Sequence, residues 1–567
     1  MKNLKPIDYI FTGCLFLIGF IFIWRAFYGV NYNDEMYYAD SLYRLFQGDV
    51  YLVHDWQLHL MSCIPVYPFY ALFRLITGSN DGVILFLRIL YVLFQLTVAL
   101  VCFLRLYHLK WGGLLVSLLY LLFTPFNIAS MSYNTMGLGF AMLTFAILSG
   151  PKKHPARDYV FCGICFALCV LSNPFAIILY FLYAAVCTGQ FILHKHKNPR
   201  STEAFSLFSL LWITAGAFFI FIIFCVMLLR RASLGELSQT FLYNFRMPGY
   251  EQNPSQWMHK LSSYFRRVYK TIPYLVWSAG AACVILPFDK RRFSHALWYL
   301  LPSAAAVVYY LCFYGLLQNH VPTNFCAMPL AFLGSLCFWL LPEKDFQYLF
   351  LWFIPGVLYS LCSHFASDTG ILCITSSYIL CSSIGALFLY QLFQAFVRES
   401  AKSITGKAAS VCILAALAVH ITVSGCLRIT FFYNEEPLPN LTAQVHTGPA
   451  KGLFTSPGMA AFHEERVSGL KSLPITENDT LLVMAMEPWA YLCTEASCAS
   501  YTCWGMAEEP IYRLYLSMFP EKYPTVIYCT DLEKALEEEP LLMQEFLTQG
   551  YEVITLESAA ALLKKKI

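Results

Sequence analysis

The sequence predicts an α-helical polytopic membrane protein with a small C-terminal α/β domain outside the bilayer. Of its 567 residues, 58% are hydrophobic and 17% aromatic, and only 13% are charged. A soluble domain averages about 25% charged residues. Mean hydropathy is +0.56, and apolar stretches long enough to cross a bilayer recur along the chain. Because backbone groups in lipid must bond internally, these stretches are expected to form a helix bundle.

Each predicted span is an apolar stretch of roughly 17 to 25 residues. The first is too long for the apolar core of a signal peptide and lacks a convincing small-residue cleavage site, so we expect it to remain as a span. About thirteen spans are expected by this criterion. They cover residues 7–28, 83–104, 112–128, 135–150, 159–173, 175–193, 205–229, 272–287, 295–316, 324–341, 346–362, 370–396 and 408–430.

Short basic segments between the spans predict the orientation, because Lys and Arg gather on the cytoplasmic side of membrane proteins. One cluster, Arg230 and Arg231 with Arg266, Arg267 and Lys270, falls on the opposite side and breaks this rule. The N-terminus is therefore expected in the cytoplasm, and an odd number of spans places the C-terminus outside. Six segments support this orientation: Lys2–Lys5, Arg105–Lys110, Lys152–Arg157, His194–Arg200, Asp289–Arg292 and Arg398–Lys407.

The chain is expected to divide into a membrane domain, residues 1–433, and an extracytoplasmic domain, residues 434–567. The second part holds 9 Lys and Arg against 19 Asp and Glu, a net charge of about −10 that leaves about +13 on the membrane domain. No glycine-rich phosphate loop follows its strands, so it is expected to be a structural or acceptor-docking cap and not a nucleotide site. Strand-like and helical stretches alternate in it, which predicts a small α/β fold: Leu481–Met486, Glu509–Met518, Thr525–Cys529, Leu532–Thr548 and Tyr551–Thr555.

Two adjacent carboxylates, Asp34 and Glu35, follow the first predicted span. Such a pair costs little at the water-facing end of a membrane helix and would be expensive inside the hydrocarbon. The polar, aromatic-rich stretch that follows, residues 36–57, is long enough to build a site on the membrane surface. We therefore expect the outer loop 28–82 to carry the active site.

Two roles are open for Asp34. Residues 35–46 fit an interfacial helix with Tyr38 and Leu42 on one face, and Asp34 could cap its first turn. Asp34 could also act as a general base, because glycosyl transfer onto a hydroxyl needs a carboxylate to take the proton of the acceptor. Glu35 would then assist it or pair with a basic residue.

Three more candidate residues, His54, Asp55 and His59, lie further along the same loop. Their side chains could bind the substrate or its phosphate, and Asp34, His54 and Asp55 together could hold a divalent metal. The spacing is not specific for a metal, because histidines at an interface are commonly satisfied by hydrogen bonds. Substrate binding and metal binding both remain open for this set.

This first outer loop resembles that of the GT-C class of polyprenyl-phosphate-sugar glycosyltransferases, which includes the protein mannosyltransferases and the lipid A aminoarabinose transferase. The resemblance is carried by Asp34-Glu35 followed by Tyr37, Tyr38 and Ala39, just after the first span. It is specific over about residues 7–105, and general in architecture beyond them.

The resemblance implies a GT-C-like fold in a bacterial plasma membrane, with Asp34 as the catalytic acidic residue and Glu35 as its neighbour. It also implies a polyprenyl-phosphate-sugar donor and a glycan, lipid or protein acceptor. The family often carries a His-Pro-Pro-Leu type segment later in the loop. The matching stretch here, His54 to Leu58, has no prolines, which leaves its role open.

Tyr38 of the first outer loop is a further candidate for binding the substrate. Other outer polar residues could complete a substrate site, namely Tyr133, Asn134 and His320, although ordinary turn chemistry also explains them. A lipid phosphate needs a cation nearby. Arg246 is the candidate that we place in the site, with Lys260, Arg266 and Arg267 as alternatives in the same long outer loop.

The function predicted from the sequence is therefore glycosyl transfer at the outer membrane surface, with the lipid bilayer and a lipid-linked sugar as partners and no nucleic acid. A transporter or flippase of lipid-linked or small substrates is the alternative. Transporters place ionisable residues in mid-span and carry repeated halves. The sequence has few charges deep in its spans and no evident internal repeat, which favours the enzyme.

Overall fold

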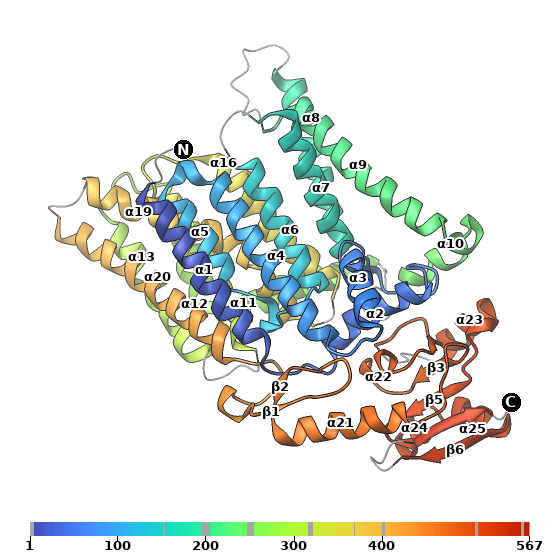
Figure 1. Ribbon diagram of the computed structural model, residues 1–567. Helices are drawn as coiled ribbons and strands as arrows, with labels where there is room; N and C mark the ends of the chain where they lie inside the picture. Colours follow the sequence, from blue (N-terminus) through green and yellow to red (C-terminus); the bar gives the residue numbers. More distant parts are fainter. Residues whose placement is uncertain are drawn as a thin grey trace.

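The computed structural model of the protein describes residues 5–150, 154–194, 204–245, 254–315, 321–367, 369–399, 403–504, 509–556 and 561–565. They form a large helical bundle with a smaller α/β domain at one end (Figure 1). Among these residues, nine helical segments are long and apolar enough to cross a membrane. Their main helices are α1 (Pro6–Ala26), α4 (Val83–Arg105), α8 (Ile177–His194), α9 (Leu207–Leu229), α13 (Ala296–Tyr309), α15 (Ala327–Leu340), α17 (Ile354–Phe365), α19 (Ile379–Glu399) and α20 (Ile404–Thr430).

Shorter helices occupy the remaining predicted spans. They are α5 (Trp111–Leu121), α6 (Tyr133–Leu148), α7 (Ala156–Ser172) and α12 (Pro273–Ile285). The polytopic helical fold predicted from the sequence is confirmed, whereas nine of the expected thirteen segments reach spanning length in the described chain. The other helices of the bundle are α10 (Leu234–Phe241), α11 (Pro254–Thr271), α14 (Pro322–Phe325), α16 (Phe346–Tyr348) and α18 (Ile371–Ser377).

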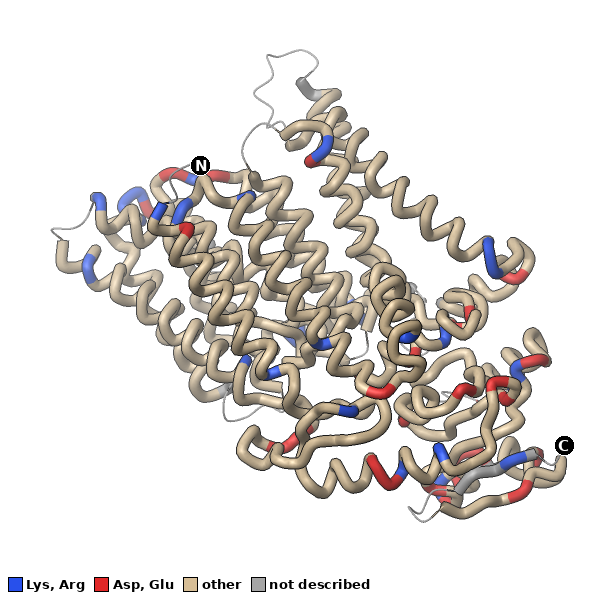
Figure 2. The backbone as a smooth tube through the Cα atoms, in the orientation of Figure 1, with Lys and Arg blue, Asp and Glu red and all other residues tan. Residues whose placement is uncertain are grey.

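The two ends of the bundle differ in charge. Figure 2 shows Lys and Arg positions (blue) near the end that carries the N-terminus, and many of the acidic positions (red) in the C-terminal domain at the opposite end. We call this second end the domain side. It also carries Asp34, at the start of the helix that follows α1. The expected side of the cell for each end stays a prediction.

Helix α2 (Asp34–Gln47) is the first element on the domain side, and it ends at Gly48, whose φ of 114° is a conformation that favours glycine. The predicted helix is confirmed, but its interfacial character is wrong. All residues from Glu35 to Leu45 are buried, because α2 packs against α4, α3 (Tyr67–Thr77), the 3₁₀ turn Leu58–Cys63 and the C-terminal domain.

The C-terminal domain is built on a five-stranded sheet in the order β4-β3-β5-β7-β6. Strand β3 is parallel to β4 and β5, while β7 is antiparallel to both β5 and β6. The predicted alternation of strands and helices is confirmed. The elements are β1 (Ala443–Gln444), β2 (Phe454–Thr455), α21 (Pro457–Lys471), β3 (Thr480–Val483), α22 (Trp489–Leu492), β4 (Ser497–Cys498), α23 (Glu509–Met518), β5 (Val526–Cys529), α24 (Leu532–Glu538), α25 (Pro540–Thr548), β6 (Tyr551–Thr555) and β7 (Ala561–Lys565).

Backbone hydrogen bonds tie this domain to the bundle. The amide of Phe454 donates to the carbonyl of Phe27 at 2.7 Å, just after α1, and the amide of Gly29 donates back to Phe454 at 2.8 Å. Further along, the amide of Trp56 donates to the carbonyl of Tyr501 at 3.0 Å. The domain therefore covers the segment that carries the predicted active site.

Helices α7 and α9 approach each other at two glycines. A Cβ atom on Gly163 would overlap the carbonyl oxygen of Ile213, and one on Gly216 would overlap the carbonyl oxygen of Val160. By contrast, Gly189 in α8 has no atom within 4 Å of its Cβ position. Small residues of this kind let membrane helices approach closely.

We predict that Gly163→Ala lowers the free energy of unfolding by about 1–3 kcal/mol, because the added methyl group overpacks the contact between α7 and α9. Gly189→Ala is the matched control and should leave stability unchanged or raise it, because alanine favours a helix. Thermal unfolding of the purified protein in detergent measures both. Equal unfolding temperatures for the two variants would contradict the close helix contact.

Candidate functional site

Asp34 is the first residue of α2, and its half-buried carboxylate faces the domain side of the bundle. Asn31 orients it: Oδ1 of Asn31 accepts from the amide of Asp34 at 2.7 Å, and Nδ2 of Asn31 donates to Oδ2 of Asp34 at 3.4 Å. Burial raises the pKa of Asp34 to about 6, although the Asn31 hydrogen bond opposes the shift. Helix capping at this turn comes from the Asn31 side chain, which accepts the Asp34 amide. The sequence indicates Asp34 itself as a candidate cap of this helix, and the structure shows Asn31 in that position.

Glu35 has a different environment. It is 1% exposed, and Nε of Arg88 donates to its Oε1 at 2.7 Å while Nη2 of Arg88 donates to its Oε2. Arg88 also donates from Nη1 to the carbonyls of Ala26 at 2.9 Å and Tyr28 at 3.0 Å. Of the two roles expected for Glu35, the pairing with a basic residue is therefore the one seen in the structure.

An aromatic cluster lies beside Asp34. The ring of Tyr133, at the first turn of α6, lies 6.0 Å from that of Tyr38 and 4.5 Å from that of His59. Nε2 of His59 is 3.5 Å from the hydroxyl of Tyr37, and burial lowers the pKa of His59 to about 4, which keeps its ring neutral. The structure thus brings together three of the predicted substrate-binding residues.

The charge of Asp34 acts on two tyrosines, Tyr133 from α6 and Tyr433 just after α20. Burial, assisted by this charge, raises the pKa of Tyr433. Asn134, the fourth predicted substrate-binding residue in this region, follows Tyr133 and interacts with its hydroxyl. We call Asn31, Asp34, Tyr38, His59, Tyr133, Asn134 and Tyr433 the Asp34 site.

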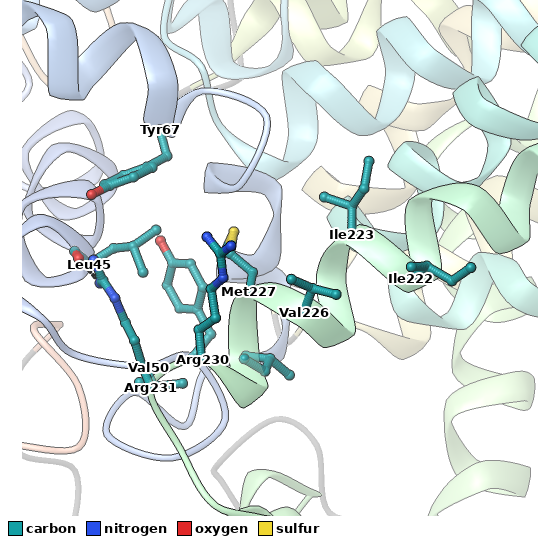
Figure 3. A pocket seen from close by; sticks show the side chains of 11 residues that line it. Leu45, Val50, Tyr67, Ile222, Ile223, Val226, Met227, Arg230 and Arg231 are labelled. Carbon is teal, nitrogen blue, oxygen red and sulfur yellow. Dashed lines mark hydrogen bonds between the residues drawn. The ribbon is translucent and has the colours of Figure 1, made fainter.

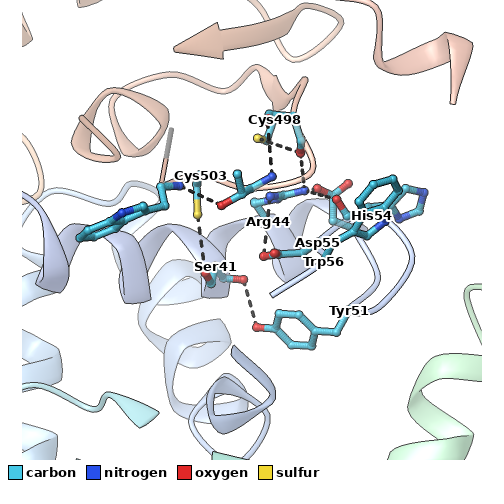
Figure 4. A network of polar contacts seen from close by, with 12 residues as sticks. Ser41, Arg44, Tyr51, His54, Asp55, Trp56, Cys498 and Cys503 are labelled. Atoms are coloured by element: carbon cyan, nitrogen blue, oxygen red, sulfur yellow. Dashed lines mark hydrogen bonds and ion pairs between the residues drawn. The ribbon is translucent and has the colours of Figure 1, made fainter. Parts of the chain in front are cut away.

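His54 and Asp55 do not join the Asp34 site, which corrects the prediction that grouped them. Nη2 of Arg44 donates to the carbonyl of His54 at 2.7 Å, and Nη1 of Arg44 lies 3.6 Å from Oδ2 of Asp55 (Figure 4). Arg44 stands ten residues after Asp34 in α2, or about 15 Å away along the helix. The length of α2 therefore keeps His54 and Asp55 away from Asp34.

Arg44 is instead the centre of a buried network between α2 and the C-terminal domain. Its Nε donates to Asp49 at 2.8 Å and its Nη2 to the carbonyl of Ser500 at 2.9 Å. Asp49 also pairs with Lys522 at 2.5 Å, and these cations hold its pKa well below the usual range despite the opposing effect of burial. Burial raises the pKa of Asp55 to about 6. The network attaches the domain and is unlike a substrate site.

Among the residues that the structure describes, no group of three His, Cys, Asp or Glu side chains is arranged to hold a metal ion. The proposed metal set of Asp34, His54 and Asp55 is divided between the two ends of α2.

Asp40, which was not predicted, is completely buried in the middle of α2. Burial raises its pKa to about 8 against the effect of Arg44, so this carboxyl group is largely protonated at neutral pH.

Cations also reach this side of the bundle from α11. Nζ of Lys260 donates to the carbonyl of Phe365 at the domain-side end of α17, at 3.1 Å. Arg267 lies against Gly370, and its charge acts on the buried ring of His364. Ser367, from the same segment, interacts with the hydroxyl of Tyr133, which links these cations to the Asp34 site.

Two predicted residues, Arg246 and His320, lie outside the described residues.

Sequence reasoning missed Asn31, Tyr433 and the partner role of Arg88 at the Asp34 site, and it missed Arg44 as the centre of the separate network. For Arg88 a signal was present, since a charge one turn inside an apolar segment calls for a buried partner. For Tyr433, about 400 residues from Asp34 in sequence, no local pattern could have indicated the contact.

Two solved structures align with the chain over nearly its whole length. Over 99% of its length it aligns with 98% of ArnT from Cupriavidus metallidurans, a structure bound to undecaprenyl phosphate, with 10% sequence identity and a TM-score of 0.41. Over 96% it aligns with 73% of the Archaeoglobus fulgidus oligosaccharyltransferase tethered to an acceptor peptide, with 12% identity and a TM-score of 0.38. No protein-family model and no curated protein matches the chain. At such scores the likeness concerns the course of the chain, and the function is argued below from its own residues.

We predict that Glu35→Gln lowers the free energy of unfolding by about 3–5 kcal/mol, because it leaves the Arg88 guanidinium buried without a counter-charge. The double variant Glu35→Gln/Arg88→Met should recover part of the loss. Thermal unfolding in detergent measures both.

Asp34→Asn is the matched control for this experiment. The raised pKa of Asp34 means that folding is opposed by its ionisation, increasingly so as pH rises from about 4 to about 6. Replacing it by an amide should therefore not destabilise the protein at neutral pH. A loss as large as that of Glu35→Gln would show that Asp34 serves the fold instead of a reaction.

Proposed function

We propose that this protein is an integral membrane glycosyltransferase. It would move a sugar from a polyprenyl-phosphate-linked donor to a glycan, lipid or protein acceptor on the outer face of the membrane. The bundle supplies a membrane location for a lipid-linked donor, and the Asp34 site lies on its domain side, where a water-soluble or surface-bound acceptor can arrive.

The main support for this proposal is the difference in environment between the neighbouring carboxyl groups of Asp34 and Glu35. Both carboxylate oxygens of Glu35 accept hydrogen bonds from Arg88, so neither is free to meet an acceptor hydroxyl. Asp34 is half-buried, oriented by Asn31, and has a pKa of about 6. A general base works best when its pKa lies near the operating pH, and strongly perturbed carboxyl groups at a protein surface are candidates for such a role.

The proposed reaction has one displacement step. The acceptor hydroxyl gives its proton to Asp34 as its oxygen bonds to the anomeric carbon of the sugar. The bond from that carbon to the phosphate oxygen of the donor breaks, and the lipid phosphate leaves with the electron pair. Attack opposite to the leaving phosphate inverts the anomeric centre. Tyr38, His59 and Tyr133 offer ring faces and polar edges for the sugar.

The leaving phosphate needs a cation, and charge-assisted hydrogen bonds to phosphate are among the stronger ones in proteins. Lys260 and Arg267 are the described cations that we assign to it, because Ser367 and Tyr133 connect their segment to Asp34. The C-terminal domain approaches the same site through Trp504, whose ring lies 5.1 Å from that of Tyr37. We infer that the domain helps to position the acceptor.

Asp34→Asn should lower turnover by a factor of about 10² to 10⁴, the usual contribution of a general base, while the protein stays folded. The assay is sugar transfer in membranes from a panel of polyprenyl-phosphate sugars. Full turnover by Asp34→Asn with the donor that the parent protein uses would remove Asp34 from the mechanism. Uptake of substrate into vesicles without glycosyl transfer would favour a transporter instead.

The pH dependence should follow the ionisation of Asp34. Because burial raises its pKa to about 6, the carboxyl group keeps its proton up to that pH and cannot accept another. We expect kcat/KM to rise about tenfold per pH unit below pH 6 and to level off above it. Intrinsic fluorescence at each pH checks that the protein remains folded. A profile that is flat down to pH 5 would contradict the assignment.

A further inference from the structure

A second site lies at the domain-side end of α9, away from the Asp34 site. A groove of about 420 Å³ separates the last two turns of α9 from the segment that follows α2. Ile222, Ile223 and Val226 line one wall, and Leu45 and Val50 lie on the other (Figure 3). Ligand pockets in proteins have volumes of about 300–1,000 Å³, so the groove can hold a hydrocarbon chain.

One wall of the groove belongs to α9, which has the length and composition of a helix that faces lipid. Ile222, Ile223 and Val226 are 45%, 44% and 48% exposed, and they belong to a segment with the length and composition of a membrane span. A groove that opens from such a helix faces acyl chains in the bilayer. Its apolar part therefore favours a lipid tail over a water-soluble ligand.

Two arginines stand at the domain-side end of this groove. Nη1 of Arg231 donates to the carbonyl of Leu45 at 2.6 Å, and Arg230 is exposed beside it. Neither guanidinium has an acidic partner among the residues that the structure describes. These are the same arginines that break the positive-inside rule, and a pair of adjacent cations above an apolar groove is complementary to an anionic lipid headgroup.

We infer that this groove binds an acidic glycerophospholipid of the bilayer. One acyl chain lies along Ile223 and Val226, and the phosphate lies between Arg230 and Arg231. The lipid is distinct from the sugar donor, because Leu45 stands eleven residues after Asp34 in α2, or about 16 Å away along the helix. A phosphate at that distance cannot be the leaving group of a sugar that reacts at Asp34.

Binding of fluorescent phosphatidylglycerol to the delipidated protein in detergent tests the inference, with phosphatidylcholine and a polyprenyl phosphate as competitors. The parent protein should prefer phosphatidylglycerol. Arg230→Gln/Arg231→Gln should weaken its binding about tenfold or more, as expected for the loss of two cations beside a phosphate. Arg266→Gln/Lys270→Gln removes two other cations of the domain side and should leave binding unchanged.

Two single variants keep the result independent of folding. Arg230→Gln preserves the hydrogen bond from Arg231 to Leu45 and should still weaken binding. Val226→Trp keeps both cations but fills the groove, and should also weaken it. Equal binding of phosphatidylglycerol and phosphatidylcholine, or unchanged binding by the double arginine variant, would overturn the inference. Stronger competition by polyprenyl phosphate would overturn it as well, in favour of a donor site. No turnover is measured, so the outcome does not depend on the proposed reaction.

Discussion

The ion pair between Arg88 and Glu35 is the contact on which the domain side of this protein depends. A guanidinium buried in a membrane helix is stable only when its donors are satisfied. Arg88 meets this requirement by binding Glu35 at the start of α2 and two carbonyls after α1. Three segments are thereby joined at one point. Asp34 is held next to this point, with its own carboxylate left outside the ion pair.

This arrangement gives neighbouring carboxylates two different environments. Glu35 is buried in an ion pair with Arg88, whereas Asp34 is partly desolvated without a cation, so that its pKa rises to about 6. The same chemistry recurs further along α2, where Arg44 is compensated by Asp49 and Asp40 is buried with a pKa of about 8. Burial raises the pKa of Asp34, Asp40 and Asp55, whereas in Asp49 nearby cations outweigh it.

The C-terminal domain makes α2 a buried helix. The sequence of α2 has the period of a helix with one apolar face, and an interfacial position followed from that pattern alone. The C-terminal domain covers the other face through α22 and β4, and hydrogen bonds run from Tyr43 to the carbonyl of Thr494 and from Arg44 to the carbonyl of Ser500. Those partners lie more than 400 residues away in the sequence, where no local signal connects them to α2.

Much of the candidate site was nevertheless predictable. Asp34 follows from two carboxylates at the end of an apolar segment, His59 from the polar loop after them, and Tyr133 from the polar residues beside a later segment. The grouping of His54 and Asp55 with Asp34 failed for a simple reason. Residues 34–47 form a rigid rod of about 20 Å, so the predicted helix itself keeps Asp34 apart from the segment that follows its other end.

The helical membrane fold, the acidic α/β domain and the candidate Asp34 can be inferred from the sequence, because hydropathy, charge and alternating patterns are local properties of the chain. The pairing of Glu35 with Arg88, the place of Asp34 outside this pair and the separate network of His54 emerge in the folded chain. Ionisation and partnership depend on which groups lie within a few ångströms in space, and the packing of distant segments sets those distances.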